Sequence, residues 1–211
     1  IRNRFANGSS GGGRGINGGV RLDHLIIEGG KPLFGSIRVH GSKNAALPIL
    51  AATVLATGKY EIYDIPELRD IDVMLQILQS IGIKATKTSC RVTLDTSTIN
   101  SVHIPDDLMG QMRSSIFLMG PMLTRYKEVT LSRPGGCAIG ARPVDLHLNG
   151  LRALGADIIE QGGLLTCRTE RLKGNTVVLD YRSVGATENM MVAAALAHGV
   201  TEIAGASKEP E

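Results

Sequence analysis

Residues 71–83, IDVMLQILQSIGI, return in outline as residues 144–156, VDLHLNGLRALGA. Each stretch has an Asp near its start, continues with apolar residues at helical spacing, and closes on a Gly followed by an apolar residue. That order predicts an amphipathic helix, a Gly C-cap and then a strand. The recurrence, at a spacing of roughly 70 residues, marks a repeated supersecondary unit.

Three short strands support the same period. They are predicted at residues 59–62, 126–129 and 200–203, each after an apolar helix rich in small residues. One such helix is expected over residues 45–56 and another over residues 108–123. Each unit therefore contains strand, helix, strand, helix and then one or two strands, a pattern typical of an α/β protein.

Composition narrows the function. Of the 211 residues, 43% are hydrophobic and only 3% aromatic, without Trp, so the core must be aliphatic. The net charge of +3 suits a small anionic substrate. The sequence lacks the long basic runs and aromatic platforms of nucleic-acid binders and any apolar run of transmembrane length, so neither nucleic acid nor membrane is an expected partner.

The cysteines favour a reducing compartment. Cys90, Cys137 and Cys167 are odd in number and widely spaced, which argues against a disulfide framework and for a cytoplasmic protein. Cys90 and Cys167 are expected in strands. No cluster of His, Cys and Asp has the spacing of metal ligands, so no metal is expected.

Two segments are predicted. Residues 1–21 include the low-complexity run NGSSGGGRG at residues 7–15 and do not begin with Met. Such a composition cannot bury a core, so a disordered or vector-derived leader is expected there. Residues 22–211 carry the fold.

Cys137 is the candidate reactive thiol. It lies in PGGCAIGARPVDLH, residues 134–147, between Arg133 and Arg142. The glycines allow the segment to turn sharply and to move. The flanking guanidinium groups favour the thiolate over the thiol. A mobile, electropositive loop with one thiol is expected to be an active-site lid. The alternative is a small buried hydrophobic residue.

Two predicted helix starts favour anions. Ser42 is a plausible N-cap before Lys43 and Asn44, and a helix N-terminus together with a Lys attracts negative charge. The alternative is a solvated Lys beside a cap. Residues 183–187, SVGAT, lead into a helix expected to begin near Glu188 and can present backbone N–H groups to a phosphate. Here the alternative is a Thr-capped helix.

Other charged residues are candidates on weaker grounds. Arg113 interrupts an apolar helix, which is unusual unless it is paired or reaches a cleft. Arg142 has the planar fork that suits phosphate or carboxylate. Asp145 can be an ordinary N-cap, as Asp72 is expected to be, and Arg125 a surface residue. His147 is expected on the helix surface or in the lining of a pocket, and not as a base.

Five quoted stretches together resemble one enzyme family. They are residues 41–50 (GSKNAALPIL), 112–116 (MRSSI), 134–147, 183–189 (SVGATEN) and 208–211 (KEPE). In this order they are similar to the UDP-N-acetylglucosamine 1-carboxyvinyltransferases, the enolpyruvyl transferases of bacterial peptidoglycan synthesis. The resemblance implies an inside-out α/β barrel domain of repeated βαβαββ units, with helices in the centre, here truncated.

The resemblance also assigns roles. Lys43 would contact phosphoenolpyruvate, and Asn44 and Arg113 the sugar nucleotide. Arg142 would bind phosphoenolpyruvate and the diphosphate, while Cys137 would act as general acid or add covalently to phosphoenolpyruvate. The remaining implied contacts, to the nucleotide and its phosphates, are Pro143, Val144, Asp145, Leu146, Ser183, Val184 and Gly185. Arg182 would replace a Lys that some family members carry.

In this family a second domain supplies an aspartate base and several arginines. The chain is therefore expected to hold most of the first domain, to be incomplete at its C-terminus and to be inactive alone. The resemblance also implies roles in cell wall biogenesis, cell shape and cell division, and sensitivity to fosfomycin. The sister enzyme that acts on shikimate phosphate lacks the Cys loop. A non-catalytic uridine-nucleotide-binding or structural half-domain is the alternative from another class.

Overall fold

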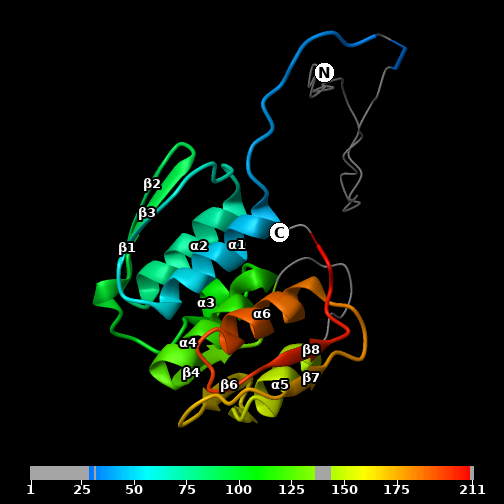
Figure 1. Ribbon diagram of the computed structural model, residues 1–211. Helices are drawn as coiled ribbons and strands as arrows, with labels where there is room; N and C mark the ends of the chain where they lie inside the picture. Colours follow the sequence, from blue (N-terminus) through cyan, green and yellow to red (C-terminus); the bar gives the residue numbers. More distant parts are fainter. Residues whose placement is uncertain (1–28, 31, 136–143, 210–211) are drawn as a thin grey trace, which may run out of the picture. The chain divides into compact units, whose positions relative to one another are not determined.

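The computed structural model describes residues 29–30, 32–135 and 144–209, and the chain divides into two units. The first unit, residues 1–37, contains no helix or strand in its described residues. The second unit, residues 38–211, carries the secondary structure shown in Figure 1.

The α-helices and 3-10 helices of the second unit contribute most of its interior. They are α1 (Lys43–Ala52), η1 (Thr53–Leu55), α2 (Arg69–Ser80), η2 (Thr96–Thr98), α3 (Asp106–Met109), η3 (Arg113–Leu118), α4 (Met119–Tyr126), α5 (Asp145–Ala153) and α6 (Val184–Ala194). The strands form three small sheets. They are β1 (Lys59–Ile62), β2 (Lys84–Thr88), β3 (Arg91–Asp95), β4 (Glu128–Ser132), β5 (Asp157–Gln161), β6 (Leu164–Arg168), β7 (Thr176–Val178) and β8 (Glu202–Ala204).

The predicted repeat is confirmed in the sheets. The first sheet has the order β1-β3-β2 and the second the order β4-β6-β5, both antiparallel. In each, a helix (α2 or α5) follows the first strand and a hairpin returns beside it. Gly82 and Gly155 end these helices with φ of +101° and +94°, as the sequence predicts for a Gly C-cap.

A third, shorter repeat follows within residues 38–211. β7 leads through α6 to β8, and the two strands pair in parallel, with Thr176 opposite Glu202. Within the second unit of the repeat, an isolated parallel bridge joins His103 to Thr130 on either side of α3, η3 and α4. Both connections have the strand–helix–strand form of an α/β protein, so the predicted class is confirmed.

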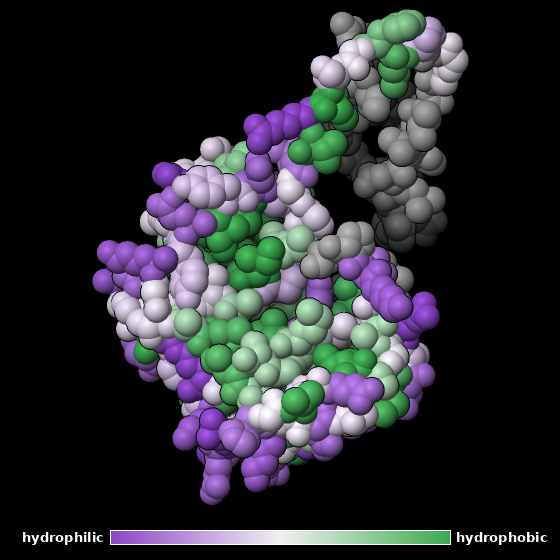
Figure 2. All heavy atoms as spheres, in the orientation of Figure 1, coloured by the Kyte–Doolittle hydropathy of each residue, from purple (hydrophilic) through white to green (hydrophobic). Residues whose placement is uncertain are grey.

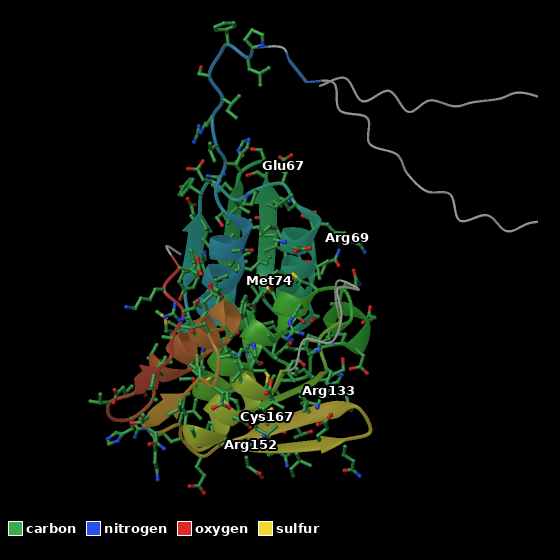
Figure 3. The ribbon with its side chains drawn as sticks, turned by 90° about the vertical axis from the view of Figure 1, so that its right-hand side faces the viewer. Glu67, Arg69, Met74, Arg133, Arg152 and Cys167 are labelled. Atoms are coloured by element: carbon green, nitrogen blue, oxygen red, sulfur yellow. The ribbon has the colours of Figure 1, made fainter. Side chains whose placement is uncertain are left out.

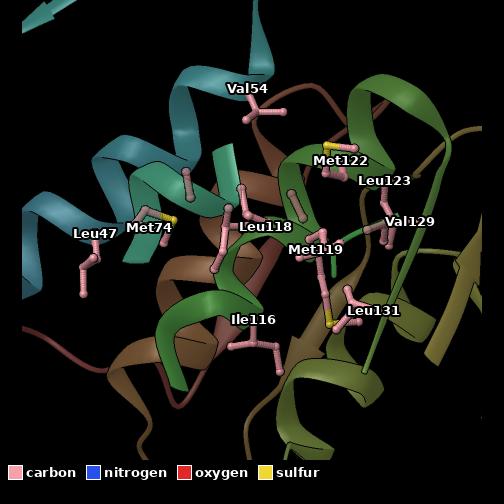
Figure 4. Packing of buried hydrophobic residues seen from close by; sticks show 14 of the residues in the cluster. Leu47, Val54, Met74, Ile116, Leu118, Met119, Met122, Leu123, Val129 and Leu131 are labelled. Atoms are coloured by element: carbon pink, nitrogen blue, oxygen red, sulfur yellow. The ribbon is translucent and has the colours of Figure 1, made fainter. Parts of the chain in front are cut away.

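Helices occupy the interior. α6 packs against α4, η3, α1 and α5, and Figure 4 shows side chains from α1, α2, η3, α4 and β4 converging on one shared core. Met119, Met122 and Leu123 of α4 are completely buried. Because burial of one such side chain is worth about 1.5–3 kcal/mol, α4 anchors the fold.

Several local predictions are wrong. Residues 108–123 do not form one helix, because the chain is extended at Met112 and continues as the 3-10 helix η3 before α4 begins. The helix expected over residues 45–56 ends as α-helix at Ala52 and continues as η1. Cys90 lies in the turn between β2 and β3 and not in a strand.

The charged residues near helix starts also differ from expectation. Asp72 is not an N-cap: it lies in the first turn of α2 and pairs with Lys87. Arg125 is not a plain surface residue. Its guanidinium donates to the Val54 carbonyl at 2.7 Å and lies 4.9 Å from the Tyr126 ring centre, so it ties α4 to the end of η1.

Candidate functional site

A pocket of about 760 Å³ lies where the N-termini of α1 and α6 meet η3 and α5. This volume is within the range of roughly 300–1,000 Å³ typical of small-molecule sites. The pocket brings together many of the residues predicted from sequence: Lys43, Asn44, Arg113, Leu146, Arg182, Ser183, Val184 and Gly185. Helix starts that are far apart in the chain therefore share one pocket.

At the α1 terminus the predicted N-cap is confirmed. Ser42 is extended, and its hydroxyl accepts the Ala45 N–H at 3.4 Å. Lys43 Nζ lies 2.8 Å from Asp70 Oδ2 of α2, and both side chains are more than one third exposed. Solvent screens such a pair, so it holds Lys43 only weakly and leaves the ammonium able to meet a bound anion.

The α6 terminus begins earlier than predicted. Ser183 is the N-cap, with its hydroxyl accepting the Ala186 N–H at 3.3 Å, and the helix runs from Val184. The predicted start near Glu188 and the Thr cap are therefore wrong. Ser183, Val184 and Gly185 form the first turn, whose N–H groups lack helical acceptors and attract anions.

Gly185 lets the backbone approach two rings. A Cβ at this position would lie 3.2 Å from Phe117 Cε1 and 3.7 Å from His147 Cε1. A larger residue would therefore crowd the Phe117 ring. The small residues predicted to open this helix thus have a packing reason as well as an electrostatic one.

His147 is buried, so the predicted alternative of a helix-surface position is wrong, while its place in the pocket lining agrees with the other alternative. Burial, with the nearby Arg113 guanidinium, lowers the pKa of His147 to about 4, and Asp145 opposes that shift weakly. The ring is therefore neutral at physiological pH. Asn189 Nδ2 lies 3.1 Å from its Nδ1.

At the start of α5, Val144 is the N-cap and is buried, and Asp145 is the first helical residue. The prediction of Asp145 as an ordinary N-cap is therefore wrong. The Tyr181 hydroxyl donates to Asp145 Oδ1 at 3.3 Å and lines the pocket. Asp145 is thus linked to the pocket through Tyr181.

Three predicted residues, Cys137, Arg142 and Pro143, lie outside the described residues, and their roles stay predictions. Arg133, predicted to favour the thiolate, donates to both carboxylate oxygens of Glu160 at 2.6 and 2.8 Å. This bond raises the pKa of Arg133 and lowers that of Glu160. Both side chains of this pair are exposed, so solvent screens it, as it screens the Lys43–Asp70 pair.

Cys167 has no chemistry to offer at neutral pH. It lies in β6, as predicted, completely buried, and burial raises the pKa of its thiol to about 12. Figure 3 shows it at the end of the fold near Arg152, away from Glu67 and Arg69. A thiol that stays protonated is a poor nucleophile, so Cys167 is not a candidate reactive thiol.

Sequence reasoning missed several lining residues. Asp70, Gln111, Phe117, Tyr181 and Glu188 all face the pocket. Asp70 stands two residues before the repeated Asp72, yet its pairing with Lys43 spans 27 residues and left no local signal. Tyr181 carried no signal of its own, since only its neighbour Arg182 was singled out.

A second hollow of about 500 Å³ lies on the β1-β3-β2 sheet. It is lined by Lys59 and Lys84 and also by Glu61 and Asp95, so its charges balance. Within residues 29–30, 32–135 and 144–209, no three His, Cys, Asp or Glu side chains are grouped to hold a metal ion. No helix in the same residues is long and apolar enough to cross a membrane.

The fold and the pocket define an α/β domain of repeated units, with two helix N-termini and several basic side chains in the lining of one pocket. Residues 27–211 match the EPSP synthase (3-phosphoshikimate 1-carboxyvinyltransferase) family. The chain belongs to this family.

Curated relatives are more specific. The chain is 51% identical over 185 residues to UDP-N-acetylglucosamine 1-carboxyvinyltransferase 2 of Caldanaerobacter subterraneus, covering 88% of this chain and 44% of the relative. It is 48% identical to UDP-N-acetylglucosamine 1-carboxyvinyltransferase of Cellvibrio japonicus, covering 90% of this chain and 46% of that protein. The chain thus spans less than half the length of the curated relatives it matches.

Solved structures agree in fold. The enolpyruvyl transferase NikO of Streptomyces tendae superposes with a TM-score of 0.71 at 23% identity, over 83% of this chain and 41% of that one. EPSP synthase of Acinetobacter baumannii superposes with a TM-score of 0.63 at 20% identity, over 84% and 40% respectively. The predicted enolpyruvyl transferase fold is confirmed, and the chain covers about two fifths of each of these two structures.

Proposed function

We propose that this chain supplies the sugar-nucleotide and phosphate-binding face of a UDP-N-acetylglucosamine 1-carboxyvinyltransferase. The observation that carries the proposal is the pocket itself, which joins Lys43, Arg113 and Arg182 to the N-termini of α1 and α6. The substrate class follows from relatives at 51% and 48% identity.

The proposed reaction transfers an enolpyruvyl group. The 3′-hydroxyl of UDP-N-acetylglucosamine adds to carbon 2 of phosphoenolpyruvate while carbon 3 gains a proton. The tetrahedral intermediate then loses phosphate and a proton from carbon 3. Fixed positive groups stabilise the phosphate and carboxylate charge, and Cys137 is the proposed general acid. No metal or organic cofactor takes part in this scheme.

Each pocket residue has a proposed contact. Lys43 and Arg142 bind phosphoenolpyruvate, while Asn44 and Arg113 bind the sugar nucleotide. The first turn of α6, with Ser183, Val184, Gly185 and the neighbouring Arg182, binds the diphosphate. The residues from Pro143 to Leu146 border the uridine. The product would enter peptidoglycan synthesis in the cytoplasm, and hence cell wall growth, cell shape and division.

The site needs a second face. The relatives are about twice as long as this chain, and we propose that their additional domain supplies the base and closes over the substrates. Closure excludes water and assembles the reacting groups. The chain of 211 residues is therefore expected to bind UDP-N-acetylglucosamine weakly and to release no phosphate from phosphoenolpyruvate.

Titration calorimetry of the chain with UDP-N-acetylglucosamine tests the site. Arg182→Ala should weaken binding about tenfold, the effect of losing one charged hydrogen bond. Arg171→Ala is the matched control, because Arg171 is also exposed but lies outside the pocket lining. Equal losses in both variants, or tighter binding of 3-phosphoshikimate than of the nucleotide, would contradict the assignment.

A phosphate-release assay tests the second face. Release from phosphoenolpyruvate that depends on UDP-N-acetylglucosamine is expected to be absent with the chain alone. If the chain turns over without any added domain, the proposal of a second face is wrong. Specific nucleotide binding without turnover is the expected result. It would describe this chain, by itself, as a nucleotide-binding half-domain.

A further inference from the structure

Asn189 is a buried amide at the meeting point of three helices. Its side chain is 1% exposed. The Oδ1 atom accepts the Gly120 N–H of α4 at 3.0 Å, and Nδ2 lies 3.2 Å from the Ile116 carbonyl oxygen of η3. The same Nδ2 lies 3.1 Å from His147 Nδ1 on α5. The side chain thus has a partner for every polar group it offers.

These partners fix the orientation of the amide. A backbone N–H can only donate and a carbonyl can only accept, so Oδ1 must face Gly120 and Nδ2 must face Ile116. His147 Nδ1 therefore meets an NH₂ group and must accept its second hydrogen. A neutral imidazole that accepts at Nδ1 carries its proton on Nε2. The tautomer of His147 follows from the network without any reference to a ligand.

The edge of the ring that is not turned to Asn189 is the edge that can meet a ligand. His147 belongs to the pocket lining, and because Nδ1 is engaged by Asn189, Nε2 is the ring nitrogen left for the pocket. The Cε1 atom, between the two nitrogens, would lie 3.7 Å from a Cβ on Gly185 in the first turn of α6. Charged side chains from the adjoining elements line this space: Lys43 of α1, Asp70 of α2, Arg113 of η3, Arg182 before α6 and Glu188 of α6. Asp145 of α5 also acts on the ring electrostatically. A neutral ring keeps the same charge and the same N–H donor as the pH rises, whereas an imidazolium would lose a proton.

We propose that Asn189 is a positioning residue that holds His147 as a neutral Nε2–H donor, aimed at a phosphate oxygen of a nucleoside diphosphate bound at the start of α6. The identity of that ligand rests on the proposed function, whereas the tautomer does not. The donor completes a set with the N–H groups of the first turn of α6. Asn189 itself does not touch the ligand.

Nitrogen NMR of the chain labelled in its histidine rings tests the first step. At pH 7 the signals of His147, assigned by their loss in His147→Gln, should show the neutral Nε2–H tautomer. Asn189→Asp replaces the donor by a carboxylate, which accepts from Nδ1–H, so the signals should move to the Nδ1–H or imidazolium pattern. Thr124→Val is the control: it removes a hydroxyl that donates to the Gly120 carbonyl within α4 at 2.8 Å and to the Ala193 carbonyl of α6 at 2.9 Å, without touching the ring.

Calorimetry with UDP-N-acetylglucosamine tests the second step. Asn189→Asp and His147→Phe should each weaken binding about tenfold, while Thr124→Val should not. His147→Gln, which keeps a neutral amide donor, should recover most of the affinity. An Nδ1–H tautomer in the unmodified chain would overturn the proposal even if Asn189→Asp fails to fold.

The outcomes separate this proposal from the assignment of the pocket. If Arg182→Ala weakens binding but His147→Phe does not, the pocket is correct and the donor role of His147 is wrong. If neither variant changes nucleotide affinity while the tautomer is as expected, the pocket assignment fails and only the positioning of the ring stands.

Discussion

His147 shows how one residue can be prepared by its surroundings. Its ring lies between Asn189, which satisfies Nδ1, and a pocket that carries Arg113. Burial and the guanidinium together lower its pKa to about 4, so the ring is uncharged at neutral pH. A neutral polar ring costs less to bury than an ion, so the site gains a donor without a buried charge.

This residue should make the stability of the chain depend on pH. The unfolded ring binds a proton near pH 6.5 and the folded ring only near pH 4, so the unfolded state holds more protons between these values. Lowering the pH through that window therefore favours unfolding, by up to about 3 kcal/mol. Urea denaturation of the chain and of His147→Gln at pH 7 and pH 4.5 measures the difference, and the variant should lose less stability on acidification. Equal losses would show that the ring is not held neutral by the fold.

The Gly helix ends were the most predictable features, whereas among the predicted N-caps only Ser42 was correct. The Gly C-caps at Gly82 and Gly155 and the N-cap at Ser42 are written in single residues, so the sequence predicts them. The break of residues 108–123 into η3 and α4 was missed because it depends on packing against α1 and α6. Local propensity does not report such contacts.

The same distinction holds for the pocket. Its backbone donors could be predicted because they belong to helix N-termini with recognisable sequences. The Lys43–Asp70 and His147–Asn189 pairs could not, since they join positions 27 and 42 residues apart. Pairs of this kind arise only when the helices pack.

The close contact of α4 with α6 depends on Gly120. A Cβ there would lie 2.6 Å from Asn189 Oδ1 and 2.8 Å from the Asn189 carbonyl oxygen. Gly120→Ala must therefore separate two helices, and a loss of about 1–3 kcal/mol in the free energy of unfolding is expected. Gly110→Ala is the control, because its nearest neighbour would be 3.5 Å away and its φ of −67° suits any residue. Denaturant unfolding that ranks the two variants equally would contradict this account of the interface.

At the scale of the whole molecule, the exposed side of α6 carries apolar residues. Met191 and Leu196, within and just after α6, are 60% and 53% exposed. Figure 2 shows hydrophobic residues gathered in the middle of the visible face, with hydrophilic ones around its margin. Such surface promotes association in water.

The chain is accordingly expected to associate as its concentration rises. Light scattering after gel filtration should show a mass that increases with loading, and the double variant Met191→Glu with Leu196→Glu should stay closer to the monomer mass of 22.4 kDa. Ile159→Glu, which changes a similarly exposed apolar residue on β5, is the control. A chain that remains monomeric at every concentration would show that the α6 face does not drive association.

Two helix N-termini, each capped by a serine, point at one pocket that also holds three basic side chains. Helix dipoles and cations of the same sign repel one another, and Asp70 and Glu188 in the same lining offset part of that repulsion. The positive potential that is left acts against the stability of the empty fold. Natural selection for heat resistance and selection for activity would then act on these positions in opposite directions. Exchanges that spread or neutralise the positive potential would survive the first regime and be removed by the second.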